Sequence, residues 1–385
     1  MTKLKTTVCI IGSGPAGIIT ALEFSKNNPE KNVLLIEYGE KGKKGIYKNS
    51  LDESIKFTNK INLHDVYEST NKGLGGSSLT WGGRCVSYDE IDFIDRPILK
   101  GGCTWDISLY KELKDYMKSA SIYFESGNPS FNLSNIEKFK DSRIADNFLE
   151  NDVTDSSIER WSMPTRFGKR YRKTIESTKN IKLLEGYEAM TFDEPDYKGN
   201  ISGLIIKSKT EELRIEADTF IIATGTQEST RLLLRNTKVF KNLQEEPAAL
   251  GKYYQGHTSG KIASIKFYGN PKNTDYGFMR DKDGIYLRRR FQFSKDYLKR
   301  KNLLNTAIWL DNPLYHKPEH KSGAMSFMYL AMTVPFLKNK LAPPAIAESV
   351  TKGQVGNRKK HLINVIKGFP NSFIKPAIIF YKRFL

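Results

Sequence analysis

Residues 7–17 read TVCIIGSGPAG, an apolar run followed by a glycine-rich turn. Thr7 to Ile11 is a short apolar run rich in β-branched residues, which predicts a strand buried on both faces. The glycine-rich turn GSGPAG follows at once, and after it IITALEFSK has apolar side chains at helical spacing. A strand, such a turn and a helix in this order form the phosphate-binding unit of dinucleotide-binding domains.

Every residue of this turn is a candidate for contact with a dinucleotide. The first glycine permits a tight turn, the second leaves room for a pyrophosphate against the backbone, and the third lets the helix pack closely on the strand. The helix N-terminus also directs N–H groups towards the phosphates. A glycine turn that binds no ligand is the alternative interpretation. The candidate residues are Gly12, Ser13, Gly14, Pro15, Ala16 and Gly17.

Residues 32–37, NVLLIE, predict a second buried strand that ends in an acid. Glu37 lies 20 residues past Gly17. A carboxylate at this spacing is expected to accept hydrogen bonds from the hydroxyls of an adenosine ribose. An acid here disfavours a 2′-phosphate, so NADP is not expected.

A second glycine-rich stretch, residues 73–84, reads GLGGSSLTWGGR and has five glycines in its first eleven residues. Such a stretch can bring backbone N–H groups against a flat ring and its phosphates. The serines add hydroxyl donors, and Trp81 adds an apolar wall beside an aromatic cofactor. A flexible linker is the alternative interpretation, and the tryptophan argues against it. The candidate residues are Gly75, Gly76, Ser77, Ser78, Trp81, Gly82 and Gly83.

These motifs carry a family resemblance. GSGPAG, LLIEYG and GLGGSSLTWGG resemble the three N-terminal FAD elements of the GMC (glucose–methanol–choline) flavin-dependent alcohol oxidoreductases. The WGGR ending is most similar to the branch that contains pyranose oxidases and the GMC-like proteins of bacterial polysaccharide gene clusters. Several flavoenzymes of that branch have a histidine, covalently joined to the flavin, just before the tryptophan. This chain has Thr80 there, so the resemblance implies FAD held without a covalent bond.

Residues 217–235, ADTFIIATGTQESTRLLLR, resemble a further element of the family, a strand that turns towards the cofactor and opens a helix. Thr224 and Gly225 would make this turn, and both are candidate cofactor-binding residues. The segment at 181–190 is similar to the strands whose backbone reads the adenine edge. The backbone near Ala189 is the candidate for that contact.

The resemblance also implies an architecture. The fold class is α/β, with an FAD-binding Rossmann-like domain of the GMC or glutathione-reductase type. A second, α+β substrate domain would contain an antiparallel sheet. The first domain is expected to be discontinuous, residues 1–125 and 180–255, and the second to take residues 126–179 and 256–385. Within the second, residues 276–293 place two alternating runs around the turn DKDG, which predicts a hairpin.

The expected reaction is oxidation of the CH–OH group of a sugar or polyol, with hydride transfer to flavin N5. A base would take the hydroxyl proton. The family's base is a histidine in a C-terminal element similar to HxxGTxRM, and none of the five histidines lies in that context, so no catalytic residue is assigned. His257 is the first to test. The chain ends where family members continue, and a catalytically incomplete flavin-binding remnant or fragment with an interaction role is the alternative.

Charge and composition set the remaining expectations. The chain has 385 residues and a formal net charge of +18, and its last 55 residues contain ten Lys and Arg against a single acid, Glu348. Such a segment fits an anionic membrane surface or a solvated basic surface with no partner. No nucleic-acid-binding motif accompanies the charge, so no nucleic-acid partner is expected.

Three cysteines give no disulfide framework and favour a cytoplasmic location, with membrane association through the basic segment as a further option. No stretch reaches the roughly 18 apolar residues that a spanning helix needs. His316 and His320 have a spacing that could suggest a metal pair, but Pro318 between them disrupts the helix that would align them, so no metal is expected.

Overall fold

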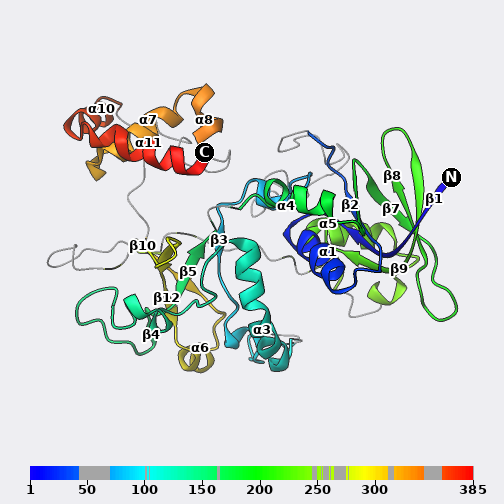
Figure 1. The fold of residues 1–385 in the computed structure, drawn as a ribbon. Helices are drawn as coiled ribbons and strands as arrows, with labels where there is room; N and C mark the ends of the chain where they lie inside the picture. The colour runs from blue at the N-terminus through cyan, green and yellow to red at the C-terminus, as the bar shows by residue number, and fades with distance from the viewer. Residues whose placement is uncertain are drawn as a thin grey trace. The chain divides into compact units, whose positions relative to one another are not determined.

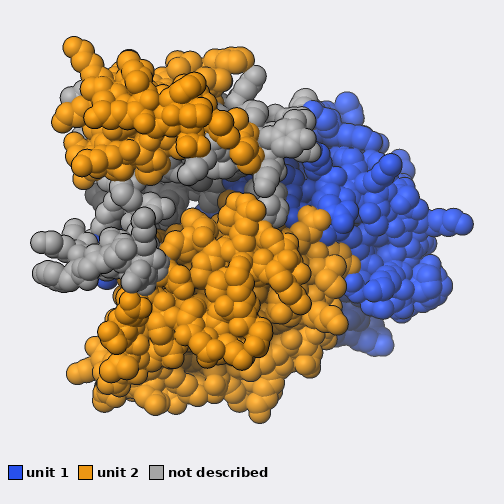
Figure 2. Space-filling view, turned by 60° about the vertical axis from the view of Figure 1, so that its left-hand side comes forward, with its two compact units in different colours: residues 1–81, 164–265 blue, residues 82–163, 266–385 orange. Residues whose placement is uncertain are grey.

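The protein is described by a computed structural model that covers residues 1–42, 70–99, 102–103, 105–162, 165–244, 249–252, 254, 260, 262–263, 275, 277–310, 316–341 and 358–384 (Figure 1). The chain forms two compact units, and each combines two separate segments (Figure 2). The first unit is Met1–Trp81 with Pro164–Ile265, and the second is Gly82–Met163 with Lys266–Leu385.

The division differs from the expected one at all three internal boundaries, the last of which follows residue 265 and not residue 255. Residues 82–125 fall in the second unit, because β3 (Arg84–Cys85) pairs with β5 (Ile158–Trp161) of that unit. Residues 164–179 fall in the first unit, because α4 (Phe167–Ser177) packs on the second glycine-rich stretch. At Gly168, on this helix, an added Cβ would lie 1.9 Å from the carbonyl oxygen of Leu74.

The first unit is built on a six-stranded sheet in the order β6-β2-β1-β9-β8-β7. Strands β6, β2, β1 and β9 pair in parallel, whereas β8 pairs antiparallel with its two neighbours, β9 and β7. This is the Rossmann-like α/β domain that the sequence predicts. The strands are β1 (Thr2–Ile11), β2 (Val33–Glu37), β6 (Ile181–Glu185), β7 (Glu188–Phe192), β8 (Gly203–Lys207) and β9 (Glu212–Ile222).

The central elements of the first unit are strands and a helix whose apolar residues are buried. The last four residues of β1 and all of β2 are buried, as expected for strands covered on both faces. Helix α1 (Pro15–Asn27) connects them and buries Ile18 and Ala21, three positions apart on one face. The first unit also contains α4, α5 (Gly225–Arg235) and the 3₁₀ helices η1 (Gly76–Leu79) and η5 (Lys241–Gln244).

The second unit contains two antiparallel sheets, in the orders β10-β11-β5-β3 and β13-β12-β4. The predicted antiparallel sheet is therefore confirmed, and the predicted hairpin is β10–β11, with Phe278 opposite Arg288. The run continues as β12, which joins the second sheet instead. The strands not yet bounded are β4 (Val153–Thr154), β10 (Phe278–Arg280), β11 (Tyr286–Arg289), β12 (Phe291–Phe293) and β13 (Ala307–Ile308).

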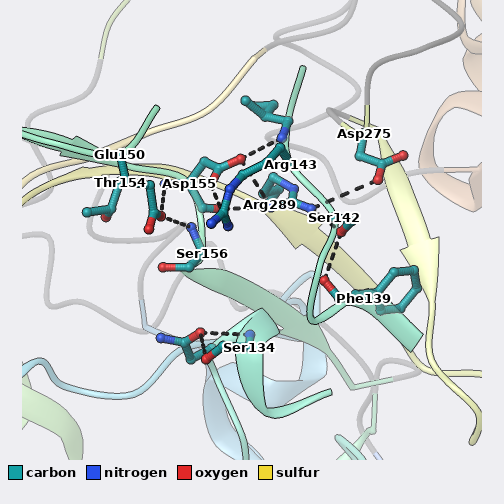
Figure 3. A network of polar contacts seen from close by, with 12 residues as sticks. Ser134, Phe139, Ser142, Arg143, Glu150, Thr154, Asp155, Ser156, Asp275 and Arg289 are labelled. Atoms are coloured by element: carbon teal, nitrogen blue, oxygen red, sulfur yellow. Dashed lines mark hydrogen bonds and ion pairs between the residues drawn. The ribbon is translucent and has the colours of Figure 1, made fainter. Parts of the chain in front are cut away.

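A buried ion pair ties β11 to the segment that precedes β5 (Figure 3). Arg289 and Asp155 are 1% and 0% exposed, and the Nη1 atom of Arg289 lies 3.2 Å from Oδ2 of Asp155. The Arg289 guanidinium also donates to Ser142 Oγ, and the backbone N–H of Ile144 donates to the same Asp155 carboxylate. Burial raises the pKa of the Asp155 carboxyl and lowers that of Arg289, so these hydrogen bonds offset a desolvation cost.

Helices make up the remainder of the second unit. None of the helices in the described ranges is long and apolar enough to cross a bilayer. His320 lies in a 3₁₀ helix, and its Nδ1 accepts from the backbone N–H of Ser322 at 2.9 Å. These helices are η2 (Glu90–Phe93), α3 (Ile107–Phe124), η3 (Leu133–Asn135), η4 (Glu137–Phe139), α6 (Lys295–Lys301), η7 (Pro318–His320), α7 (Gly323–Met332), α8 (Pro335–Leu341), α10 (Arg358–Lys367) and α11 (Asn371–Phe384).

Candidate functional site

The candidate site lies at the carboxyl edge of the parallel strands in the first unit. Ile11, the last residue of β1, is opposite Ile36 of β2 and Ile222 of β9. The carboxyl ends of these three strands therefore meet at one edge of the sheet, where ligands of open α/β sheets bind. Three of the sequence motifs meet here: the GSGPAG turn, the acid Glu37 and the turn after β9.

The GSGPAG turn has the steric properties expected of a pyrophosphate loop. Gly12 has φ +100°, and an added Cβ there would lie 2.7 Å from the carbonyl oxygen of Ala223. At Gly17 an added Cβ would lie 1.9 Å from the carbonyl oxygen of Gly12, so only glycine fits. Gly14, in contrast, has an ordinary φ of −65°, and an added Cβ there would meet no atom within 4 Å. The second glycine thus faces open space, and the other two are fixed by packing.

Helix α1 begins beside that open space. Its N-cap is Gly14, Pro15 occupies its first turn, and the first turn contains no acidic side chain. The first N–H groups of a helix have no carbonyl partners within the helix and carry a partial positive charge. Ala16 lies in this first turn, so the arrangement suits an anion that binds next to Gly14.

Glu37 connects the loops around this space. Its side chain is 6% exposed, and each of its carboxylate oxygens accepts two hydrogen bonds. Oε2 accepts from the backbone N–H and the hydroxyl of Ser13, at 3.2 and 2.6 Å. Oε1 accepts from the backbone N–H groups of Gly39 and Gly73, at 2.7 and 2.8 Å. One buried charge therefore joins the GSGPAG turn, the end of β2 and the start of the second glycine-rich stretch.

This role of Glu37 is absent from the sequence interpretation, which assigns the carboxylate to ribose hydroxyls. A carboxylate offers about four acceptor positions, and the chain itself supplies four donors. The contact with ribose stays a prediction. The second role depends on the close approach of Gly39 and Gly73 in the structure, where an added Cβ at Gly39 would lie 2.3 Å from the backbone nitrogen of Gly73, and no sequence pattern indicates this approach.

The second glycine-rich stretch packs directly on the first. The N–H of Gly75 donates to the carbonyl oxygen of Ser13 at 2.8 Å. An added Cβ at Gly76, which has φ +50°, would lie 2.9 Å from the Cα of Gly14. The two predicted loops are thus in contact, and a single ligand could touch both.

Ser77, Ser78 and Trp81 have different environments within this stretch. Ser77 is exposed and so is open to a ligand. The buried Ser78 donates to the carbonyl oxygen of Gly75 at 2.6 Å and accepts from the N–H of Phe167 at 3.1 Å, so its hydroxyl serves the loop itself. The indole N–H of Trp81 donates to the carbonyl oxygen of Thr165 at 3.0 Å, which fixes the orientation of the ring.

The turn after β9 lies at the same edge of the sheet, beside the GSGPAG turn. Thr224 is the N-cap of α5, and its hydroxyl lies 2.9 Å from Ser229 Oγ. Gly225 follows with φ +78°, a conformation that favours glycine. The N–H of Ala223 donates to the carbonyl oxygen of Ile11 at 2.8 Å, so this turn is held next to the GSGPAG turn. The structure places Thr224 and Gly225 beside the GSGPAG turn, and their contact with a cofactor stays a prediction.

Ala189 lies on β7, opposite Ile206 of β8, at the start of an irregularity in the register. The connection from β6 to β7 is anchored near the acid, because the N–H groups of Gly186 and Tyr187 donate to the carbonyl oxygen of Glu37 at 2.9 and 3.0 Å. The strand that carries Ala189 therefore starts close to the end of β2. The contact of its backbone with adenine stays a prediction.

Charged side chains that the sequence interpretation does not include gather beyond Glu37. The Lys72 ammonium is 3.7 Å from the centroid of the Tyr38 ring, and burial lowers its pKa to about 8. Arg231 of α5 bridges Glu228 and Glu188 at 2.6 and 3.2 Å. The only sequence signal was position, since Tyr38 directly follows the acid and Lys72 directly precedes the second glycine-rich stretch.

The remaining predicted residues do not join this constellation. Gly82 and Gly83 fall in the second unit, and their contact with a cofactor stays a prediction. His257 lies outside the described residues. Among the residues that the structure describes, no three His, Cys, Asp or Glu side chains are grouped so that they could hold a metal ion.

The comparisons with known proteins give only distant structural similarities. No protein-family profile and no curated protein matches the chain. One similar solved structure is pyridoxine 4-oxidase from Mesorbium loti, with 15% identity and a TM-score of 0.37 over 60% of this chain and 52% of that one. Another is formate oxidase from Aspergillus oryzae RIB40, studied for FAD modification, with 16% identity and a TM-score of 0.34 over 61% and 48% of the two chains.

A third is L-proline dehydrogenase from P. horikoshii, with 14% identity and a TM-score of 0.22 over 58% of this chain and 23% of that one. The chain spans about half the length of the first two proteins. The function proposed below depends on the geometry of the chain itself.

Proposed function

We propose that this chain is an FAD-dependent oxidoreductase of the GMC type that acts on the CH–OH group of a sugar or polyol. The observation that carries the proposal is the pair of glycine loops, joined by Glu37, around the open space at Gly14. No contact within the described chain requires a glycine at position 14, so the open space there is best explained by a ligand. The N-terminus of α1 beside this space also suits an anion.

The residues present fit FAD. The GSGPAG turn and the first turn of α1 would hold the pyrophosphate, and the segment from Glu37 to Gly39 with the start of β7 would hold the adenosine. Gly75, Gly76 and the exposed Ser77 would approach the flavin half, because they pack on Gly14 and continue away from it. Bound FAD would supply a hydride acceptor, N5 of its ring system.

FAD is proposed to be held without a covalent bond. Thr80 occupies the position before Trp81, and its Oγ1 accepts from Asn71 Nδ2 at 2.7 Å. A threonine hydroxyl lacks the nucleophilic ring nitrogen through which a histidine forms such a link. The side chain before the tryptophan therefore stabilises the loop through its hydrogen bond with Asn71.

The sheet β10-β11-β5-β3 offers, within the second unit, a surface suited to a sugar ring. Trp161 and Phe278 lie edge to face with ring centroids 4.9 Å apart, and Phe278 is 50% exposed. The Arg288 guanidinium lies 5.2 Å from the Trp161 ring and is held by Glu159 Oε2, which accepts from its Nη2 at 2.6 Å. Flat apolar rings beside a few oriented polar groups are the usual composition of small-molecule sites.

Anaerobic titration of the flavin-loaded protein tests the proposal. A panel of sugars and polyols should bleach the flavin absorbance band, while organic acids and amino acids should leave it unchanged. Restoration of the band by oxygen or an artificial acceptor would show turnover. A flavin that no member of the panel reduces would contradict the proposed activity. The catalytically incomplete flavin-binding protein would then be the better description.

A further inference from the structure

The C-terminal helices α7, α10 and α11 have an unusual interior. Figure 1 shows them side by side, and α7 contacts both of the others. Beside the apolar or aromatic Tyr329, Met332 and Val365, the buried side chains include several polar ones. Ser326 and His361 are 0% exposed, and Ser372 is 1% exposed. Polar groups in this number normally lie on the outside of a water-soluble helical bundle.

These polar groups are paired with one another and with backbone carbonyls. His361 Nε2 lies 3.1 Å from the carbonyl oxygen of His316, which can only accept, so this nitrogen donates. Its Nδ1 lies 2.9 Å from Ser326 Oγ, which in turn accepts from Asn364 Nδ2 at 3.1 Å. Ser372 Oγ donates to the carbonyl oxygen of Val365 at 2.9 Å. Hydrogen bonds of buried polar groups therefore join α10 to α7 and to α11.

The helix backbones also approach closely through small residues. An added Cβ at Gly323 would lie 2.0 Å from Ser372 Oγ, and one at Gly368 would lie 3.2 Å from the Cα of Gly323. Small residues at contacts, with interhelical hydrogen bonds, are typical of helices that associate in a lipid environment, where burying apolar side chains against each other gives no advantage.

The large apolar side chains of α10 lie on the outside. Exposed fractions on this helix and the turn after it range from 48% to 70%. Successive members of the set are close together at helical spacing, so they form a continuous stripe. They are Leu362, Ile363, Ile366 and Phe369.

Helix α11 extends this stripe. Phe373, Ile374 and Ile378 are 42%, 47% and 48% exposed, and the ring centroid of Phe373 is 6.0 Å from that of Phe369. A continuous exposed apolar surface of this kind marks an interaction surface. We define the docking face as the seven exposed apolar residues of α10, its following turn and α11.

Charge identifies the occupant of this face. Residues 358–384 contain seven Lys and Arg and no Asp or Glu. Arg358, Lys359 and Lys367 are exposed on α10, the helix that carries the stripe. A second copy of the chain would bring its own basic side chains against these and be repelled. A bilayer with anionic headgroups offers both the apolar layer and the opposite charge.

We propose that α10 and α11 dock on an anionic lipid bilayer and lie in its interfacial plane. The docking face would enter the boundary between headgroups and acyl chains, and the basic side chains would contact the headgroups. Helix α11 has 14 residues. At 1.5 Å per residue it is about 21 Å long, shorter than the hydrocarbon core of about 30 Å, so it lies along the surface.

Vesicle co-sedimentation of the full chain tests this proposal. We expect the protein to pellet with vesicles of phosphatidylcholine and phosphatidylglycerol and to stay largely in the supernatant with phosphatidylcholine alone. High salt should weaken the binding, because it screens the charges. A protein that stays in the supernatant with both vesicle types would overturn the proposal. So would binding that is equal for both.

Two sets of substitutions locate the contact. Ile366→Ser with Phe369→Ser should lower the partition coefficient about 100-fold, because two large side chains no longer enter the apolar layer. Lys359→Gln with Lys367→Gln should lower it about 30-fold on anionic vesicles only. The matched control is Leu149→Ser with Tyr197→Ser, which changes apolar residues that are 86% and 91% exposed elsewhere and should leave binding unchanged.

A spectroscopic measurement keeps the test independent of folding defects. Phe369→Trp retains an aromatic side chain at a position that is 70% exposed, so the fold should persist. Relative to the parent chain, its tryptophan emission should shift to the blue when anionic vesicles are added. Tyr197→Trp is the control and should show no shift. An unshifted Phe369→Trp spectrum, or a concentration-dependent dimer that hides the face without lipid, would overturn the proposal.

Discussion

At the scale of single residues, Glu37 and Gly14 have opposite relations to their surroundings. The Glu37 carboxylate is buried and accepts four hydrogen bonds from three segments of the chain. Gly14 faces open space, although its backbone conformation would accept any residue. Glu37 therefore stabilises the fold by itself, whereas no contact within the described chain requires the absence of a side chain at Gly14.

Glu37→Gln should destabilise the protein even without FAD. The amide keeps the shape but replaces one acceptor oxygen by an NH₂ group that faces N–H donors. Leaving buried donors unpaired should lower the free energy of unfolding by about 2–4 kcal/mol. Urea unfolding of the FAD-free protein measures this difference. An unchanged free energy would mean that the carboxylate serves a ligand alone.

Gly14→Val should abolish FAD binding while the fold persists. The added side chain meets no atom of the chain within 4 Å at its Cβ, but it occupies the space assigned to the pyrophosphate. The matched control is Gly277→Val, because Gly277 also has no atom within 4 Å of an added Cβ and lies in the second unit. Flavin absorbance per protein and the far-ultraviolet circular dichroism spectrum of both variants check the prediction. A flavin-loaded Gly14→Val protein would refute the assignment of this turn.

At the scale of elements, sequence patterns predicted those strands whose burial is uniform. The apolar run at 7–11 lies in β1, and the run at 32–37 contains β2. A strand covered on both faces needs apolar side chains at successive positions, so it can be recognised from its sequence alone. The hairpin around DKDG was also predictable from its turn residues. The position of residues 82–125 was not, because a two-residue strand, β3, decides it through a long-range pairing with β5.

Arg289 shows what alternation alone cannot reveal about an element. Alternation of Leu287, Arg289 and Phe291 suggests one wet and one buried face of the hairpin. Arg289 is in fact buried beside Leu287, at 1% and 0% exposure, because Asp155 comes from a segment more than a hundred residues earlier to pair with it. Only the fold brings the two charges together.

The Asp155–Arg289 pair should show strong coupling. Arg289→Met leaves a buried carboxylate without its partner and should cost about 3–5 kcal/mol of unfolding free energy. Adding Asp155→Asn to that variant should cost less than Asp155→Asn alone, with a coupling energy of about 1–3 kcal/mol. A double-mutant cycle by chemical denaturation gives this value. Additive effects of the two substitutions would show that the pair contributes little to the hairpin.

At the scale of the whole molecule, the features suited to a dinucleotide and those suited to other ligands lie in different units. The first unit contains the glycine loops, Glu37 and the turn after β9, which are the parts suited to a dinucleotide. The second contains an aromatic and arginine-lined sheet face and the lipid-docking helices. Sequence motifs predicted the first set because glycine positions are dictated by local backbone geometry. They did not predict the charged side chains at Lys72 and Arg231, which long-range packing brings together.

The central claim is that the glycine loops of the first unit hold FAD, and the flavin content of the purified full-length chain tests it most directly. The protein should show flavin absorbance bands with about one FAD per chain. Acid precipitation should release this flavin into the supernatant as FAD, because Thr80 offers no covalent link. Flavin that stays with the pellet would contradict the non-covalent attachment. A folded protein that neither carries flavin nor binds added FAD would contradict the claim itself.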